Sequence, residues 1–120
     1  MTDLTLSDRA LVLLITVIIE TAGMTAFSLL WPGQRAHLLR NVGLAAGMNL
    51  FTHAVLWTTL PLLPIGGMPA LCGSQILIVF AEGLVYASVC GFAPLTAALL
   101  SLALNAAVYW GGVLILGWPQ

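Results

Sequence analysis

The chain has 120 residues, of which 61% are hydrophobic and 6% are charged, with a net charge of −1 and a mean hydropathy of +1.09. This composition excludes an ordinary soluble globular domain and indicates an integral protein of the lipid bilayer. The charge balance provides no basic surface for a polyanion, so no nucleic-acid partner is expected.

Four apolar runs, each long enough to cross a bilayer, alternate with short breaks that contain proline or glycine. They predict helices over about 9–31, 40–60, 70–90 and 94–116. Long helices with short connections pack as antiparallel neighbours. The sequence therefore predicts one all-α transmembrane domain over 1–120, an up-down-up-down bundle of four helices.

The arginines indicate the orientation of this bundle. Arg35 and Arg40 lie in the first connection, whereas the N-terminal arm holds only Arg9. The positive-inside rule places the first connection in the cytoplasm and both termini outside.

Four polar residues lie near the centres of the four runs, one in each run: Glu20, Asn49, Glu82 and Asn105. Counted at about 1.5 Å per residue, they have similar depths in the membrane. Lipid cannot solvate these groups, so we expect them to face the interior of the bundle and to form one hydrogen-bonded network.

Three further polar residues are expected to join this network. His53 lies four residues after Asn49, on the same helical face, with Thr52 beside it, and Ser101 lies four residues before Asn105. These are the candidate site residues, with Thr52 and Ser101 as secondary members.

The cluster has two interpretations. The functional one is a proton or cation site, or a metal centre that uses His53 with the two carboxylates; the structural one is that its hydrogen bonds hold the helices together. Two ionised glutamates without a nearby Lys or Arg are costly, so at least one is protonated unless a cation or protonated His53 balances the charge. No Glu-x-x-His pair is present. Accordingly no metal ligands are predicted, and catalytic residues and cofactors stay unassigned.

Small residues predict close approach between helices. Gly43 and Gly47 form a Gly-x-x-x-Gly motif, and Gly83 and Ala87 form a second small-residue ridge. Such motifs serve packing within the bundle, and they also suit docking on another membrane subunit.

The two halves of the chain resemble each other. The first and third runs each carry a central Glu, and the second and fourth each carry a central Asn. A duplicated helical hairpin explains this pattern and makes the repeat parallel; coincidence in an Ala/Leu-rich composition is the alternative.

Several short motifs are similar to those of an uncharacterised family of small four-helix bacterial membrane proteins with mid-membrane Glu and Asn residues. They are the mid-helix Glu20, Asn49-Leu-Phe-Thr52-His53, Glu82-Gly-Leu-Val-Tyr86 and Ser101-Leu-Ala-Leu-Asn105. Where the family has Asn and Pro after the Thr, this chain has His53 and Ala54. The resemblance supports the polar cluster and implies a bacterial inner membrane protein, but it supplies no activity.

From these observations we expect a small accessory or structural subunit of a larger membrane complex, with a membrane-protein partner or a second copy of itself. The alternative is a small proton- or cation-coupled transporter that acts as an oligomer, because four helices enclose little space. A third hypothesis is an intramembrane enzyme that uses carboxylates or a metal; it has less support because no Gly-x-Ser-x-Gly elbow is present.

Overall fold

The structure is a computed structural model that describes residues 6–62, 64 and 67–116. Its four long helices are α1 (Leu6–Leu30), α2 (Leu38–Thr59), α3 (Gly67–Val89) and α4 (Pro94–Leu116). Two short 3₁₀ helices, η1 (Arg35–His37) and η2 (Leu60–Leu62), flank α2. The described residues contain no strand, which confirms the predicted all-α class.

Three of the helices are long and apolar enough to cross a membrane. These segments are Leu6–Leu30, Cys72–Val89 and Pro94–Ile115. α2 has 22 residues but is not among them, and it carries Arg40, Asn41 and His53. The four predicted runs are therefore all helical, but the second is more polar than a typical span.

Proline and glycine set the ends of the helices. Gly33 and Gly91 adopt positive φ angles of 81° and 71°, which a side chain disfavours, and they follow α1 and α3. α3 begins at Gly67, three residues before the predicted start. Pro69 lies in its first turn, where the missing N–H has no intrahelical acceptor.

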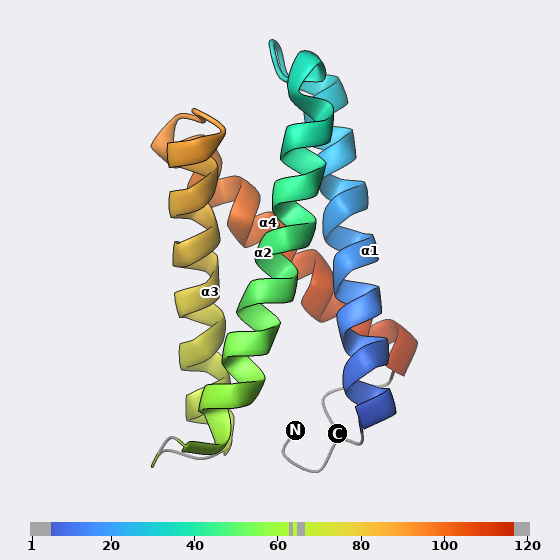
Figure 1. The fold of residues 1–120 in the computed structure, drawn as a ribbon, viewed down its shortest axis with the longest axis vertical. Helices are drawn as coiled ribbons and strands as arrows, with labels where there is room; N and C mark the ends of the chain where they lie inside the picture. Colours follow the sequence, from blue (N-terminus) through green and yellow to red (C-terminus); the bar gives the residue numbers. More distant parts are fainter. Residues whose placement is uncertain (1–5, 63, 65–66, 117–120) are drawn as a thin grey trace.

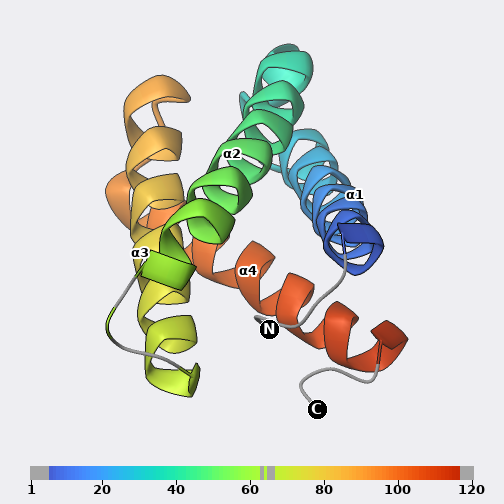
Figure 2. The same cartoon turned by 60° about the horizontal axis from the view of Figure 1, so that its bottom comes forward.

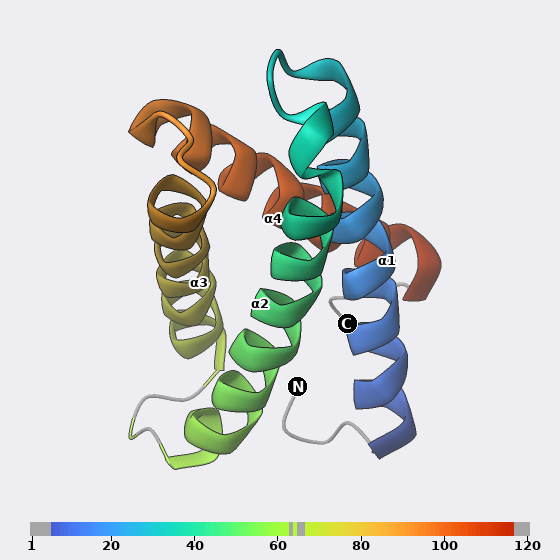
Figure 3. The same ribbon diagram turned by 45° about the horizontal axis from the view of Figure 1, so that its top comes forward.

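The helices form two antiparallel hairpins, α1–α2 and α3–α4, and α4 crosses α1 obliquely (Figures 1 and 2). α2 and α3 make few contacts; they approach each other near η2 and separate toward the opposite end (Figure 3). The chain directions alternate as expected, but the α2–α3 side of the expected bundle is sparse.

Polar side chains occupy much of the interior. Among the described residues, eight buried side chains are polar or charged and eight are hydrophobic, whereas large apolar side chains such as Ile18, Phe51 and Phe80 are exposed. This distribution differs from that of a soluble domain, in which glutamate is almost never fully buried unless it is paired and the largest apolar side chains lie mostly inside.

Close helix approach occurs at glycines other than those of the Gly-x-x-x-Gly motif. A Cβ at Gly23 would collide with Leu104, and one at Gly111 would collide with Ile19, so both glycines permit the α1–α4 crossing. Gly83 is buried and its Cβ position lies 3.7 Å from the Ala98 Cα, while Ala87 is half-buried.

The predicted packing role of Gly43 and Gly47 is wrong within this chain. Both are exposed, and a Cβ at either would meet no atom within 4 Å. They lie two positions from the buried Ala45, and two residues correspond to about 200° around a helix. The Gly-x-x-x-Gly face therefore points away from α1.

Candidate functional site

The site contains two similar Glu–Asn pairs, one in each hairpin. In the first hairpin, the Asn49 Nδ2 on α2 donates a hydrogen bond to the Glu20 Oε2 on α1. In the second, the Asn105 Nδ2 on α4 donates to the Glu82 Oε2 on α3 at 2.8 Å. Each asparagine thereby joins the two helices of its own hairpin.

Each amide nitrogen also donates to a backbone carbonyl one turn earlier on its own helix. Asn49 Nδ2 lies 2.8 Å from the Ala45 oxygen, and Asn105 Nδ2 lies 2.9 Å from the Ser101 oxygen. The second bond fixes the orientation of each amide, and the amide in turn fixes its carboxyl group.

The two pairs meet in one buried centre. Glu20 and Glu82 are 0% exposed, Asn49 is 1% exposed and Asn105 is half-buried. The carboxyl groups of Glu20 and Glu82 are near enough to interact electrostatically, and the Tyr86 phenol, also 0% exposed, interacts with both.

One oxygen of each glutamate has no protein partner. Glu20 Oε1, Glu82 Oε1 and the Tyr86 hydroxyl are buried and make no hydrogen bond. The chain's only basic side chains other than histidine are Arg9, Arg35 and Arg40, and none of them forms an ion pair with these carboxyls among the described contacts. Two negative charges here therefore require a proton or a bound cation for balance.

Of the two secondary residues, only Ser101 joins two helices. Ser101 Oγ on α4 donates to the Val79 oxygen on α3 at 2.8 Å, so it joins the second hairpin. Thr52 is buried, but its hydroxyl donates to the Met48 oxygen of its own helix at 2.8 Å.

His53 lies apart from the carboxyl groups. Its Nδ1 is 3.0 Å from the Asn49 backbone oxygen, and its half-buried ring packs edge-on to Trp57 at 5.3 Å between centroids. The expected link between His53 and the glutamates is not among the described hydrogen bonds, because the ring nitrogen is engaged with the backbone of α2.

Tyr86 is a member of the centre that sequence reasoning missed. It follows Glu82 by four residues, which places both on one face of α3. That spacing was the signal that could have identified it.

A second polar cluster lies at the end of the hairpins that carries η1. Asn41 Nδ2 donates to Ser28 Oγ at 3.0 Å and to Gln34 Oε1 at 3.1 Å. Arg40 donates to Asn41 Oδ1 through Nε and Nη2, and its Nη2 also donates to the Cys90 oxygen at 3.2 Å. Sequence reasoning also missed this cluster, although Asn41 precedes Asn49 by two helical turns.

Arg40 thus connects the first hairpin to the end of α3. A cation at a helix C-terminus is favourable because it complements the helix dipole. Burial raises the pKa of the Cys90 thiol, and the neighbouring Arg40 guanidinium acts in the opposite direction.

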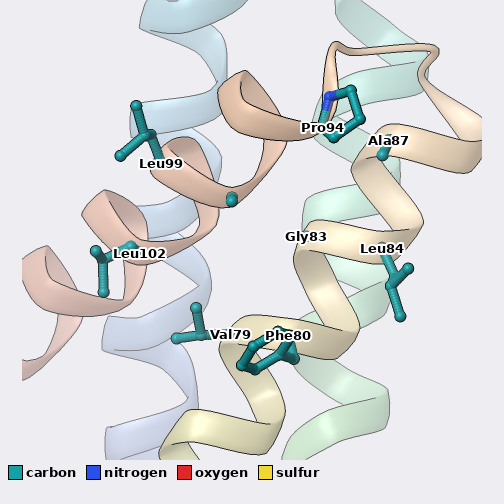
Figure 4. A pocket seen from close by; sticks show the side chains of 9 residues that line it. Val79, Phe80, Gly83, Leu84, Ala87, Pro94, Leu99 and Leu102 are labelled. Atoms are coloured by element: carbon teal, nitrogen blue, oxygen red, sulfur yellow. The ribbon is translucent and has the colours of Figure 1, made fainter.

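An apolar groove lies between α3 and α4 (Figure 4). It encloses about 340 Å³, and Val79, Phe80, Leu84, Leu99 and Leu102 are among its lining residues. No polar side chain lines it, so it offers nothing to orient a polar ligand.

Among the described residues, no three His, Cys, Asp or Glu side chains come together as metal ligands. No family model, curated protein or solved structure matches the chain.

Proposed function

We propose that the chain is an integral membrane protein whose Glu20/Glu82 centre binds and exchanges protons or small cations, as part of a proton- or cation-coupled transporter that acts as an oligomer. The observation that carries this proposal is the pair of fully buried glutamates, each held by an asparagine through one oxygen only. Ionisable groups at such depth commonly mark ion or proton pathways.

The distribution of side chains supports placement in a bilayer. Three helices are long and apolar enough to span it, and large apolar side chains cover their exposed faces. Within that bilayer we place the η1 end, with Arg35 and Arg40, in the cytoplasm and the opposite end outside. The compartment proposed is the bacterial inner membrane.

A purely structural role explains the centre less well. Helix association needs only the Glu–Asn hydrogen bonds, and a glutamine would supply the same acceptor without the cost of a buried ionisable group. The unpartnered Glu20 Oε1 and Glu82 Oε1 are better explained by a mobile ligand.

The matching hairpins support duplication of an ancestral hairpin. Glu20, Met24 and Ser28 are buried in steps of four on α1, and the same steps relate the buried Glu82 and Tyr86 of α3 and Cys90 directly after it. α1 and α3 run in the same direction (Figure 1). Parallel repeats of this kind occur in transporters, where the ligand site lies at the interface between the repeats.

The second candidate is an accessory subunit of a larger membrane complex. The sparse α2–α3 side and the exposed Gly43 and Gly47 on α2 favour it, because small residues permit close approach of another helix. The intramembrane enzyme has no comparable observation in its favour.

Proton flux in reconstituted liposomes tests the first candidate. A potassium gradient with valinomycin supplies a membrane potential, and an enclosed pH dye reports proton entry. We expect flux with the parent chain, and flux at the level of empty liposomes with Glu20→Gln or Glu82→Gln. Ser88→Ala is the matched control, because Ser88 is exposed and its hydroxyl bonds the Leu84 oxygen of its own helix.

Unchanged flux in both glutamine variants would contradict the proposal. Absence of flux from the parent, together with copurification of a larger membrane protein in mild detergent, would favour the accessory subunit.

A further inference from the structure

Three buried oxygens of the centre lack a hydrogen-bond partner: Glu20 Oε1, Glu82 Oε1 and the Tyr86 hydroxyl. They belong to three fully buried side chains that interact electrostatically. Buried polar atoms without a partner are rare in native proteins, and a bound ion is one of the explanations for them.

We propose that these three oxygens form one site for a single alkali-metal cation, which binds in exchange for one proton. The inference rests on the proposed function and narrows it to a ligand class and to three ligand atoms.

The asparagines prepare the two carboxyl groups for this role. Asn49 and Asn105 occupy the Oε2 atoms of Glu20 and Glu82, and each asparagine is itself held by a backbone carbonyl. The Oε1 atoms stay available for a ligand. Tyr86, one turn after Glu82 on α3, adds a neutral oxygen.

Charge balance sets the exchange ratio. The ionisable or polar groups toward the site are Glu20 from α1, Asn49 from α2, Glu82 and Tyr86 from α3 and Asn105 from α4, and Cys90, directly after α3, acts on Tyr86. The His53 Nδ1 is engaged with the Asn49 oxygen, and Arg40 with Asn41 and the Cys90 oxygen.

Two carboxyl groups in this setting are neutral with two protons, or with one proton and one monovalent cation. When the cation binds, one carboxyl O–H bond breaks, its proton leaves to water, and the carboxylate oxygen contacts the cation. The charge of the centre is unchanged, so burial does not penalise the exchange.

The donor set favours an alkali-metal cation over other metals. Oxygen ligands suit hard cations. Mg²⁺ needs a near-octahedral shell and retains water, and Ca²⁺ takes about 6–8 oxygens. Three fully buried oxygens meet neither requirement. Zinc, copper and nickel favour nitrogen or sulfur ligands. No cluster of three His, Cys, Asp or Glu side chains that could hold a metal occurs in the described part of the chain.

Proton release from the purified protein tests this site. The full chain in weakly buffered detergent is mixed with NaCl or LiCl, with choline chloride as the ionic-strength control, and a pH dye counts protons while calorimetry gives the affinity. We expect saturable binding with release of about one proton per cation, as neutrality requires.

The variants separate the ligands from the scaffold. Glu20→Gln combined with Glu82→Gln should abolish proton release, because no carboxyl proton is then left to exchange. Tyr86→Phe should weaken binding by about tenfold, equivalent to about 1.4 kcal/mol, with the ratio unchanged. Tyr109→Phe is the control because Tyr109 is 43% exposed on α4. Circular dichroism and gel filtration verify that each variant folds.

Equal affinity of Tyr86→Phe and the parent would remove Tyr86 from the site. Release of two protons by Mg²⁺ or Ca²⁺, without a response to Na⁺ or Li⁺, would overturn the choice of a monovalent cation. If the protein does not respond to cations but still shows Glu-dependent proton flux in liposomes, the cation site is refuted and the proposed function stands. If the cation response and the proton flux are both absent, the proposed function is refuted as well.

Discussion

At the scale of single residues, two asparagines determine what the glutamates can do. Each Nδ2 group uses one N–H for a carbonyl of its own helix and the other for a carboxyl on the neighbouring helix. Because a carboxyl and a primary amide have similar shape and acceptor capacity, a glutamine at either Glu position can keep the helix-joining bond but cannot ionise.

We therefore predict that Glu82→Gln preserves stability and that Glu82→Leu does not. Leucine removes the carboxyl acceptor of the Asn105 amide and leaves one N–H of this half-buried side chain without that acceptor, at a cost of about 1–3 kcal/mol. Thermal unfolding in detergent measures this difference, with Ser88→Leu as a control at an exposed position of α3. Equal unfolding temperatures of Glu82→Leu and the parent would show that the Asn105 bond contributes nothing.

Much of this site could be predicted from the sequence. A polar side chain within an apolar helix avoids lipid and faces the interior, and the depth of that side chain in the membrane follows from counting residues along the helix. The pairing of Glu20 with Asn49 and of Glu82 with Asn105 could not, since depth alone does not fix which helices touch. The expected link between His53 and the glutamates is not among the described hydrogen bonds for a related reason. A residue on the same helical face as Asn49 can still bond to the backbone of its own helix, as the His53 ring does.

At the scale of helices, the crossing of α1 and α4 brings the two hairpins together. Gly23 on α1 and Gly111 on α4 let side chains of the opposite helix reach the backbone, and Arg40 adds a polar link between α2 and the end of α3. The sequence indicated four helices and their approximate ends through proline and glycine. It did not reveal this crossing, because Gly23 and Gly111 belong to no recognisable motif.

A matched pair of glycine substitutions tests the crossing. Gly23→Leu should destabilise the monomer by about 1–3 kcal/mol, as overpacking does, because its side chain would collide with Leu104. Gly43→Leu should leave monomer stability nearly unchanged, because that position faces open space. Unfolding in detergent is the measurement, and a larger loss at Gly43 than at Gly23 would contradict the described packing.

Size-exclusion chromatography of the same two variants adds information on assembly. If the Gly43 and Gly47 face contacts another subunit, Gly43→Leu should disrupt the assembly without affecting the fold, which would support the accessory-subunit candidate.

At the scale of the whole molecule, the protein combines a polar centre with an apolar exterior. The α1–α2 and α3–α4 hairpins each contribute one Glu–Asn pair, and the interior between them holds both glutamates and Tyr86. The start of α1 and the end of α4 lie toward one end of the molecule, opposite η1 (Figure 1). The terminal residues assigned to the outside, 1–5 and 117–120, lie outside the described residues.

Glu20 and Glu82 share a buried centre, and we predict that this centre never holds two uncompensated negative charges. Infrared spectroscopy of the protein in lipid bilayers at neutral pH tests it most directly, because a protonated carboxyl group has its own C=O stretching band. Without alkali cations we predict such a band, which weakens in Glu20→Gln and in Glu82→Gln but not in Asp8→Asn. Its absence from the parent, or a band that both glutamine variants leave unchanged, would contradict the account.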